Sequence, residues 1–250
     1  MKGKSKSLAS LVIEPQEAKR SLKGRGQLDL IASHLGLINL DLELATELGG
    51  SSLSQSKEKF VRVHRRLSEG LSLLAAATDP PYDIVLIDCP PNFNITTKTA
   101  LVASDHVLVP AKPDYLSTLG IDYLQRSIAE LVKDYNDYRD HVTDKDDDTE
   151  MPAIDPQILG VVFTMVQFYD AEPIKAQAEF IAQVKRTGVP CFQSMMRENK
   201  SAFADAPQYG RPVVLHSYNN PTFRNIVSEL EDLTEEFRKD VGLLSTGGSP

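Results

Sequence analysis

The sequence predicts an α/β fold, built as a mostly parallel sheet flanked by helices. Two runs, DIVLI at 83–87 and ILGVVFT at 158–164, are almost continuously apolar. Strands that are buried on both faces of a parallel sheet have this composition. Segments with helical spacing of apolar residues lie between the candidate strands, and such alternation predicts parallel strands joined by right-handed crossovers.

The individual elements follow in chain order. Strands are expected at 27–31 (QLDLI), 83–87, 106–110 (HVLVP) and 158–164, and also at 189–193 and 213–215. Helices are expected at 57–77, at 119–135 and at about 221–240, where Pro221 falls in the first turn. Each has one apolar stripe at three- and four-residue steps, formed in the first by Phe60, Val63, Leu67, Leu71 and Leu74, and in the second by Ile121, Leu124, Ile128, Leu131, Val132 and Tyr135.

Length and composition limit the organisation of the chain. The 250 residues fit one large α/β domain or two small ones, and 41% hydrophobic residues exclude global disorder. We expect a single domain over 1–250, with a basic N-terminal segment (1–26), an exposed acidic loop (141–153) and a flexible tail (241–250). Two cysteines fit a reducing cytosol, and no apolar run reaches about 18 residues, so we expect a soluble cytoplasmic protein and no membrane contact.

The net charge of −8 is distributed unevenly. Residues 1–26 carry seven basic side chains against two glutamates, and residues 57–66 carry five against one. The overall charge therefore excludes a wholly basic nucleic-acid coat protein but not a local basic patch. Arg62, Arg65 and Arg66 lie off the apolar stripe of the helix at 57–77. They form either a solvated helix face or a sequence-independent contact to DNA phosphates.

Asp88 is the most informative residue for chemistry. It ends the apolar run 83–87 and is followed by Cys89, Pro90 and Pro91. Ligands of open α/β sheets bind at the carboxyl ends of the strands, and an Asp there is suited to hold Mg²⁺ on a bound nucleotide. The alternative is that Asp88 caps a helix starting near Asn92.

The segment from Tyr82 to Ile121 resembles the central signature of the ParA/MinD family of deviant-Walker ATPases. The matching positions are Asp88, Pro90, Pro91, Ala100, Leu101, Asp105, Pro110, Pro113 and Gly120. Further on, GVVFTMV (160–166) resembles the next core strand of the family, and 197–215 resembles its R-x-N…EAP-x-x-G-x-P segment, with Asp205 in place of Glu. The resemblance covers roughly 27–240. The acidic final helix favours the ParA branch, because MinD-type proteins end in a basic membrane helix.

The resemblance also reveals a gap at the start of the chain. Family members begin with a strand, a KGGxGKT/S loop, a helix and a second strand ending in D-x-DPQ, and none of these motifs occurs here. Gly3-Lys4-Ser5 spells GK[ST] but has neither the earlier glycine nor the preceding strand that a P-loop requires. We therefore expect a P-loop-NTPase-like fold missing its first βαβ unit, either N-terminally incomplete or a pseudo-ATPase with a repaired sheet. The isolated chain is expected to bind ATP weakly or not at all.

The resemblance implies a ParA-like partition ATPase that forms an ATP-dependent dimer on non-specific DNA and is stimulated by a ParB-like centromere-binding protein. ATP and Mg²⁺ would be the cofactors, with Asp88 as the catalytic and magnesium-holding carboxylate. Thr164 and Met165 fall near where the family contacts the adenine base, although they could also be core filler. Non-specific DNA contacts are predicted at Arg62, Arg65, Arg66, Arg197 and Lys200. The alternative function is a non-catalytic module that contacts DNA or a partition partner without ATP turnover, so enzymatic activity stays open.

Overall fold

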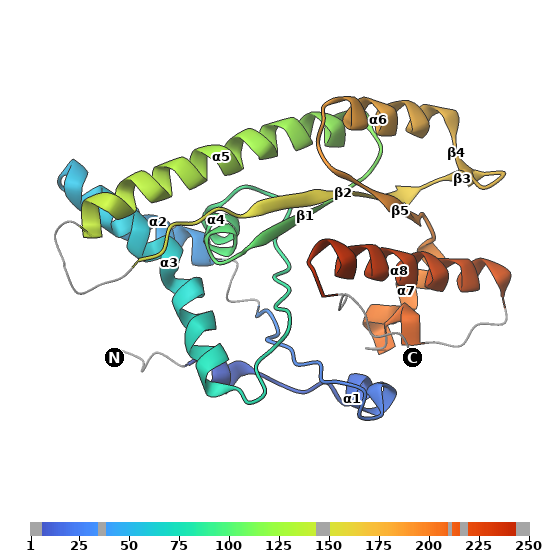
Figure 1. Cartoon of the computed structure of the whole chain (residues 1–250), viewed down its shortest axis with the longest axis horizontal. Coiled ribbons are helices and arrows are strands. Elements are labelled where there is room, and N and C mark those ends of the chain that lie inside the picture. The colour runs from blue at the N-terminus through green and yellow to red at the C-terminus, as the bar shows by residue number, and fades with distance from the viewer. Residues whose placement is uncertain (1–6, 35–38, 144–150, 210–211, 216–219, 244–250) are drawn as a thin grey trace. The chain divides into compact units, whose positions relative to one another are not determined.

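The computed structural model describes residues 7–34, 39–143, 151–209, 212–215 and 220–243 (Figure 1). The chain divides into two compact units. Unit 1 is formed by 1–19, 24–105 and 124–156, and unit 2 by 20–23, 106–123 and 157–250. The helix α5 (Tyr115–Thr143) begins in unit 2 and ends in unit 1. The single domain expected over 1–250 stays a prediction.

Unit 2 contains a three-stranded parallel sheet in the order β1-β2-β5. The strands are β1 (His106–Ala111), β2 (Gln157–Val166) and β5 (Cys191–Arg197). The central strand β2 is deeply buried, since Val161, Val162, Phe163 and Val166 are each at most 3% exposed. This confirms the parallel sheet that the apolar run at 158–164 predicted. In Figure 1, α6 (Lys175–Arg186) and α8 (Pro221–Asp240) lie on opposite sides of this sheet.

The core of unit 2 forms where α6 packs onto β2. Gly160 of β2 permits close packing, because a Cβ atom there would lie 3.0 Å from the Phe192 ring. A hairpin, β3 (Phe168–Tyr169) with β4 (Glu172–Pro173), follows β2 directly. A second cluster joins α7 (Lys200–Tyr209), the 3-10 helix η3 (Val213–Leu215) and α8 through Ala202, Val213 and Ile226. The buried residues of the first cluster are Ala111, Ile121, Val161, Phe163, Val166, Ile181, Val184 and Val189.

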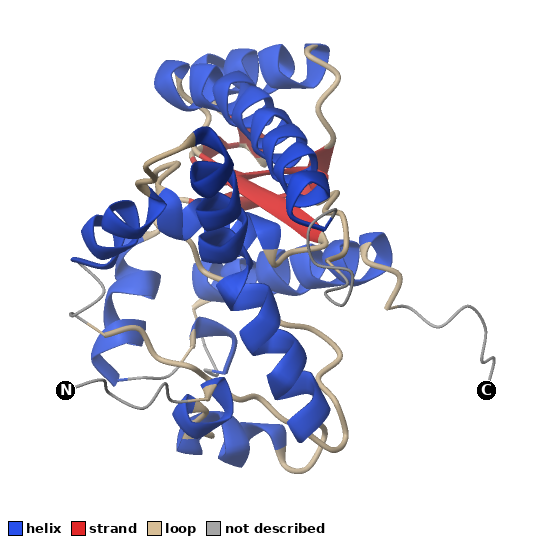
Figure 2. Ribbon diagram, turned by 90° about the vertical axis from the view of Figure 1, so that its left-hand side faces the viewer, coloured by secondary structure: helices blue, strands red, loops and turns tan. Residues whose placement is uncertain are grey.

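The named elements of unit 1 are all helices; Figure 2 shows the helices of the chain in blue and its strands in red. The long helix α3 confirms the apolar stripe predicted at 57–77 and begins earlier, because the Ser52 hydroxyl accepts a hydrogen bond from the backbone N–H of Gln55 at 3.3 Å. The Asp41 carboxylate fixes the start of α4 by accepting from the backbone N–H of Thr96 at 2.9 Å and from its hydroxyl at 2.8 Å. The elements are η1 (Leu8–Leu11), α1 (Gln16–Leu22), which runs into unit 2, α2 (Leu40–Leu48), α3 (Leu53–Ala77), α4 (Ile95–Val102) and the second half of α5.

Three of the predicted strands are wrong. Residues 27–31 make only one isolated antiparallel bridge, between Leu30 and Ile13. Residues 83–87 form no strand, and residues 213–215 form η3. The strand expected at 189–193 begins two residues later, at Cys191. A strand exists only where a partner strand accepts its hydrogen bonds, so an apolar run alone does not determine one.

The two longest helices beyond α3 match the sequence pattern. Helix α8 has the predicted bounds, with Pro221 in its first turn and the Asn220 side chain accepting from the backbone N–H of Thr222 at 2.8 Å. Helix α5 covers 119–135 and extends to both sides, and it buries Ile121, Ile128, Leu131 and Tyr135 as predicted.

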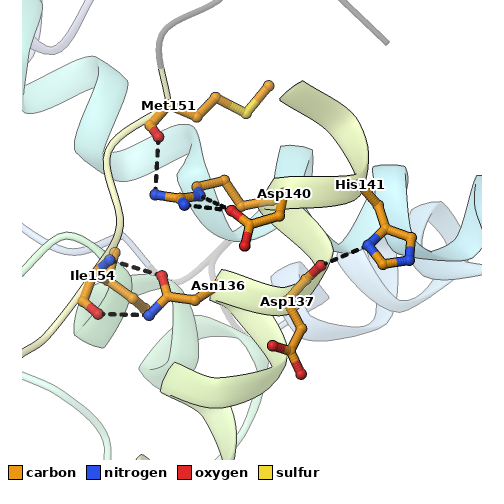
Figure 3. Close-up of polar contacts among 7 residues, drawn as sticks. Asn136, Asp137, Asp140, His141, Met151 and Ile154 are labelled. Carbon is orange, nitrogen blue, oxygen red and sulfur yellow. Dashed lines mark hydrogen bonds and ion pairs between the residues drawn. The ribbon is translucent and has the colours of Figure 1, made fainter. Parts of the chain in front are cut away.

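The acidic loop predicted at 141–153 differs at its start, where α5 continues to Thr143. Its residues 144–150 lie outside the described residues, as do 1–6 of the basic segment and 244–250 of the tail. Figure 3 shows how the chain returns to α5: the Asn136 side chain pairs with both the backbone N–H and the carbonyl of Ile154 at 2.9 Å. Because one side-chain amide satisfies both backbone polar groups of Ile154, Asn136 fixes this residue against α5.

Candidate functional site

The carboxyl edge of the sheet in unit 2 has an unusual backbone at Met165. This residue has a φ of 55° and a side chain that is 55% exposed, between the half-buried Thr164 and the fully buried Val166. A positive φ is costly for a residue with a side chain, and such positions cluster at functional sites. The carboxyl edge of a parallel sheet is also where ligands of α/β proteins bind. The structure thus brings both predicted nucleotide residues to that edge.

A glutamine network supports this strained turn. Gln177 of α6 is only 7% exposed, and its amide donates to the Met165 carbonyl at 3.4 Å while it accepts from the backbone N–H of Gln167 at 2.7 Å. The Gln167 side chain donates to Glu198 at 2.8 Å, and the Glu198 backbone N–H donates to the Val166 carbonyl at 2.9 Å. The ends of β2 and β5 are therefore held together by side chains as well as by strand pairing.

Arg197, predicted to contact DNA, is held at the end of β5. Its Nε donates to the Glu229 carboxylate at 2.6 Å, its backbone N–H donates to the same group at 3.0 Å, and its guanidinium lies 5.4 Å from the centre of the Phe168 ring. Sequence reasoning missed Glu229 and its neighbour Glu236. Their separation of seven residues, two turns on one face of α8, is the signal that could have revealed them.

Asp88 is exposed and lies in unit 1, directly after the apolar run 83–87. It does not cap α4, because the Asn94 side chain accepts from the backbone N–H of Thr97 at 2.9 Å and so caps this helix. The adjacent Cys89 is exposed, but partial desolvation and, second, the charge of Asp88 raise the pKa of its thiol, which makes it a poor nucleophile.

The surroundings of Asp88 do not fit a bound ATP and magnesium ion. Within the described part of the chain, no group of three or more His, Cys, Asp or Glu side chains could hold a metal ion. A triphosphate also requires several backbone N–H groups that converge at a helix N-terminus. The first N–H groups of α4 are already bonded to Asn94 and Asp41. Asp88 therefore offers a single carboxylate to a metal ion, without the backbone N–H groups that would bind the phosphates.

The arginines of α3 are partly neutralised by nearby acids. Arg66 forms an ion pair with Glu47, and the side-chain hydrogen bond of this pair lowers the pKa of the glutamate. Arg65 pairs with Glu69 at 3.2 Å, one turn along the helix. Arg62 is exposed. In unit 2, Lys200 is exposed at the first residue of α7. The structure brings Arg62, Arg65 and Arg66 together on α3, whereas Arg197 and Lys200 belong to unit 2.

A parallel sheet with helices on both sides and a polar carboxyl edge defines a P-loop-NTPase-like α/β protein. Residues 2–140, more than half of the chain, match the AAA domain family AAA_31. The chain belongs to this family and, with its ParA and Soj relatives, to the ParA/MinD-type partition ATPases.

The relatives cover most of this chain but are longer. The chromosome partitioning protein ParA of Caulobacter vibrioides is 28% identical over 191 residues, which is 76% of this chain and 57% of the relative. The sporulation initiation inhibitor protein Soj of Bacillus subtilis is 26% identical over 193 residues, 76% of this chain and 60% of the relative. The chain thus spans less than two thirds of the length of these curated relatives.

Solved structures support the fold. Apo McdA from Cyanothece superposes with a TM-score of 0.60 at 18% identity, covering 90% of this chain and 79% of that one. Cobyrinic acid a,c-diamide synthase of Mycobacterium smegmatis, solved with bound ADP and magnesium, gives 0.51 at 17% identity, covering 82% and 70%. Among the described residues, no helix combines the length and apolar character that crossing a membrane requires.

Proposed function

We propose that this chain is part of a ParA-like partition ATPase, one that acts in plasmid or chromosome segregation as an ATP-dependent dimer on non-specific DNA in the cytoplasm. The observation that carries the proposal is the carboxyl edge of the sheet in unit 2. There, Thr164 and Met165 lie near the end of the central strand, at the position where the family resemblance predicts the adenine contact. A ParB-like protein would be the partner that stimulates hydrolysis.

ATP and Mg²⁺ are the cofactors of the proposed function, and Asp88 is the carboxylate that would hold the metal. The structurally similar McdA binds ATP, and cobyrinic acid a,c-diamide synthase binds ADP and magnesium, which supports the choice of these cofactors. Because unit 1 offers no phosphate cradle in its described residues, we propose that the phosphate loop is supplied by sequence outside these 250 residues. The chain is then N-terminally incomplete as an ATPase.

Calorimetric titration of the 250-residue chain with ATP and Mg²⁺ tests this assignment. We expect a dissociation constant in the millimolar range or no measurable heat, since base contacts at Met165 without phosphate contacts amount to roughly 4 kcal/mol or less. The matched measurement uses a chain to which a KGGxGKT-containing first unit has been joined, which should bind far more tightly. A micromolar dissociation constant for the 250-residue chain would falsify the proposed absence of a phosphate site.

The second candidate is a non-catalytic module that contacts DNA or a partition partner without turning over ATP. The observation that favours it is the environment of Asp88, which is exposed and has no second metal ligand within the described residues. The two functions differ in one measurable property. Joining a phosphate-loop unit should give ATP hydrolysis that Asp88→Asn abolishes in the first case, and no hydrolysis in the second.

Non-specific DNA binding is proposed for the basic face of α3. Replacing Arg62, Arg65 and Arg66 together by Ala should lower the salt-dependence slope of DNA binding by about 1 to 3, because each phosphate contact contributes about 0.9 to the slope. Arg62 should account for most of the change, since Arg65 and Arg66 are already paired with acids.

Fluorescence anisotropy with a labelled duplex at several salt concentrations measures this slope. Lys133→Ala, at an exposed position of α5, is the matched control and should leave the slope unchanged. An unaltered slope in the triple variant would exclude the three arginines of α3 as DNA contacts. Arg197 and Lys200 would then be the remaining predicted contacts. For Arg197 such a role requires release from Glu229.

A further inference from the structure

Met165 is an exception in an otherwise buried part of β2. Val161 and Val162, consecutive residues that face opposite sides of the sheet, are 0% and 3% exposed, so both faces of this strand are covered. Met165 is 55% exposed, and it alone among the non-glycine residues of β2 has a positive φ, of 55°. The left-handed backbone therefore turns this side chain out of the sheet core, at a conformational cost that its surroundings must offset.

Strand pairing does not provide that support on both sides of Met165. The last residue pair between β1 and β2 joins Ala111 to Phe163, so β1 ends before Met165 is reached. The side-chain amide of Gln177 takes the place of a strand, because it donates to the Met165 carbonyl at 3.4 Å and accepts from the backbone N–H of Gln167 at 2.7 Å. These groups belong to residues two apart, the pair that one residue of a parallel neighbouring strand would bond.

The position of Gln177 is itself fixed. Its side chain is 7% exposed and shares the buried face of α6 with Ile181 and Val184, at steps of four and three residues. Its backbone N–H donates to the Ile174 carbonyl at 2.9 Å, and the backbone N–H of Ile174 donates to the Gln167 carbonyl at 2.9 Å. Because both ends of the buried amide are bonded, Gln177 couples the position of α6 to the backbone of Met165.

We propose that Gln177 is a positioning residue for the base of the nucleotide. It holds Met165 in the left-handed conformation and so keeps its side chain at the carboxyl edge, where the polarizable thioether packs on the face of a planar heterocyclic base. The role rests on the proposed function, which assigns the base contact to Thr164 and Met165. Without the amide, the backbone of Met165 relaxes toward an ordinary strand conformation, and only the remaining left-handed fraction presents the side chain to a base.

Methyl NMR of the full 250-residue chain with isotope-labelled methionine methyl groups tests this role. The probe is adenosine, which carries the base but no phosphate, and at millimolar concentration it should shift the Met165 methyl signal through the ring current of the base. Gln177→Leu should displace this signal before adenosine is added and weaken the adenosine response about tenfold, because the left-handed fraction falls to about a tenth. The signal of the buried Met196 on β5 should stay in place and so report an intact sheet.

Gln177→Glu is the second variant, since its ionised carboxylate still accepts from Gln167 but cannot donate to the Met165 carbonyl. It should also displace the Met165 signal. Gln183→Leu is the matched control, because Gln183 is an exposed glutamine of the same helix, and it should change neither the signal nor the adenosine response.

The possible outcomes separate the role of Gln177 from the proposed function. A Met165 signal that both Gln177 variants leave in place would overturn the role of Gln177, and so would a full adenosine response in Gln177→Leu. If Gln177→Leu displaces the Met165 signal but adenosine does not shift it in the original chain, the hold of Gln177 on Met165 is supported. That result contradicts the base contact and with it the proposed function at this edge.

Discussion

Lowering the pH from about 7 to about 4.5 is expected to destabilise the folded chain by about 2 to 3 kcal/mol through His64 alone. This histidine of α3 is 1% exposed, and its pKa is lowered from 6.5 to about 4, first by burial and second by the charge of Lys98. As the pH falls, the unfolded chain takes up the proton before the folded chain does. The contribution of His64 is therefore complete above about pH 6.5 and is lost as the pH approaches about 4.

The surroundings of His64 explain why it resists protonation. Its Nδ1 lies 3.2 Å from the Thr99 hydroxyl, and that hydroxyl donates to the Ile95 carbonyl at 2.9 Å. Nδ1 must then be the donor in the contact with Thr99, which leaves the proton-free nitrogen at Nε2. The Phe60 ring packs edge-on at 4.4 Å between centroids. A second proton would place a charge in a buried site beside an aromatic ring and near the charge of Lys98.

Urea unfolding at several pH values checks this prediction. His64→Leu should reduce the pH dependence of the free energy of unfolding by the stated amount while retaining the fold, because leucine fills a similar apolar volume. His106→Leu replaces an exposed histidine and should leave the dependence as in the original chain. If His64→Leu and the original chain lose stability in parallel between about pH 7 and about pH 4.5, another group carries the effect.

The sequence predicted those elements whose signal is local. Helix α8 shows the periodic stripe, an asparagine cap and Pro221 in its first turn, and its bounds matched. Strand β2 is apolar on both faces and finds its partners in β1 and β5. Residues 83–87 carry the same composition, yet they form no strand among the residues that the structure describes. Strand formation depends on distant residues, so an apolar run predicts a strand only when its neighbours are also present.

In the candidate site, too, the features with a local signal were predicted and those that depend on distant residues were not. Thr164 and Met165 were predicted at the end of a core strand, and the structure places them at the carboxyl edge of the sheet. The positive φ of Met165 was not predictable, because methionine carries no preference for that conformation and Gln177 imposes it from another element. The Asp41 contact to α4 was missed for a similar reason, since 55 residues separate it from Thr96.

Glu229→Ala is expected to lower the free energy of unfolding by about 2 to 3 kcal/mol. The Glu229 side chain is 16% exposed and accepts from both the guanidinium and the backbone N–H of Arg197, whose side chain is 26% exposed. Its removal leaves a half-buried cation and a strand-edge donor without partners, and the stacking on Phe168 does not replace either bond. Glu229→Gln keeps one acceptor oxygen and should lose only about half as much.

Thermal and urea unfolding of these variants measure the loss, with Glu231→Ala as the control on an exposed position of α8. The control should change stability by about 0.5 kcal/mol or less. Because Glu229 also closes the edge of β5, Glu229→Ala should in addition aggregate faster on heating than Glu231→Ala does. Equal stability of the two alanine variants would show that Arg197 finds another partner, and that α8 does not hold the end of β5 through this carboxylate.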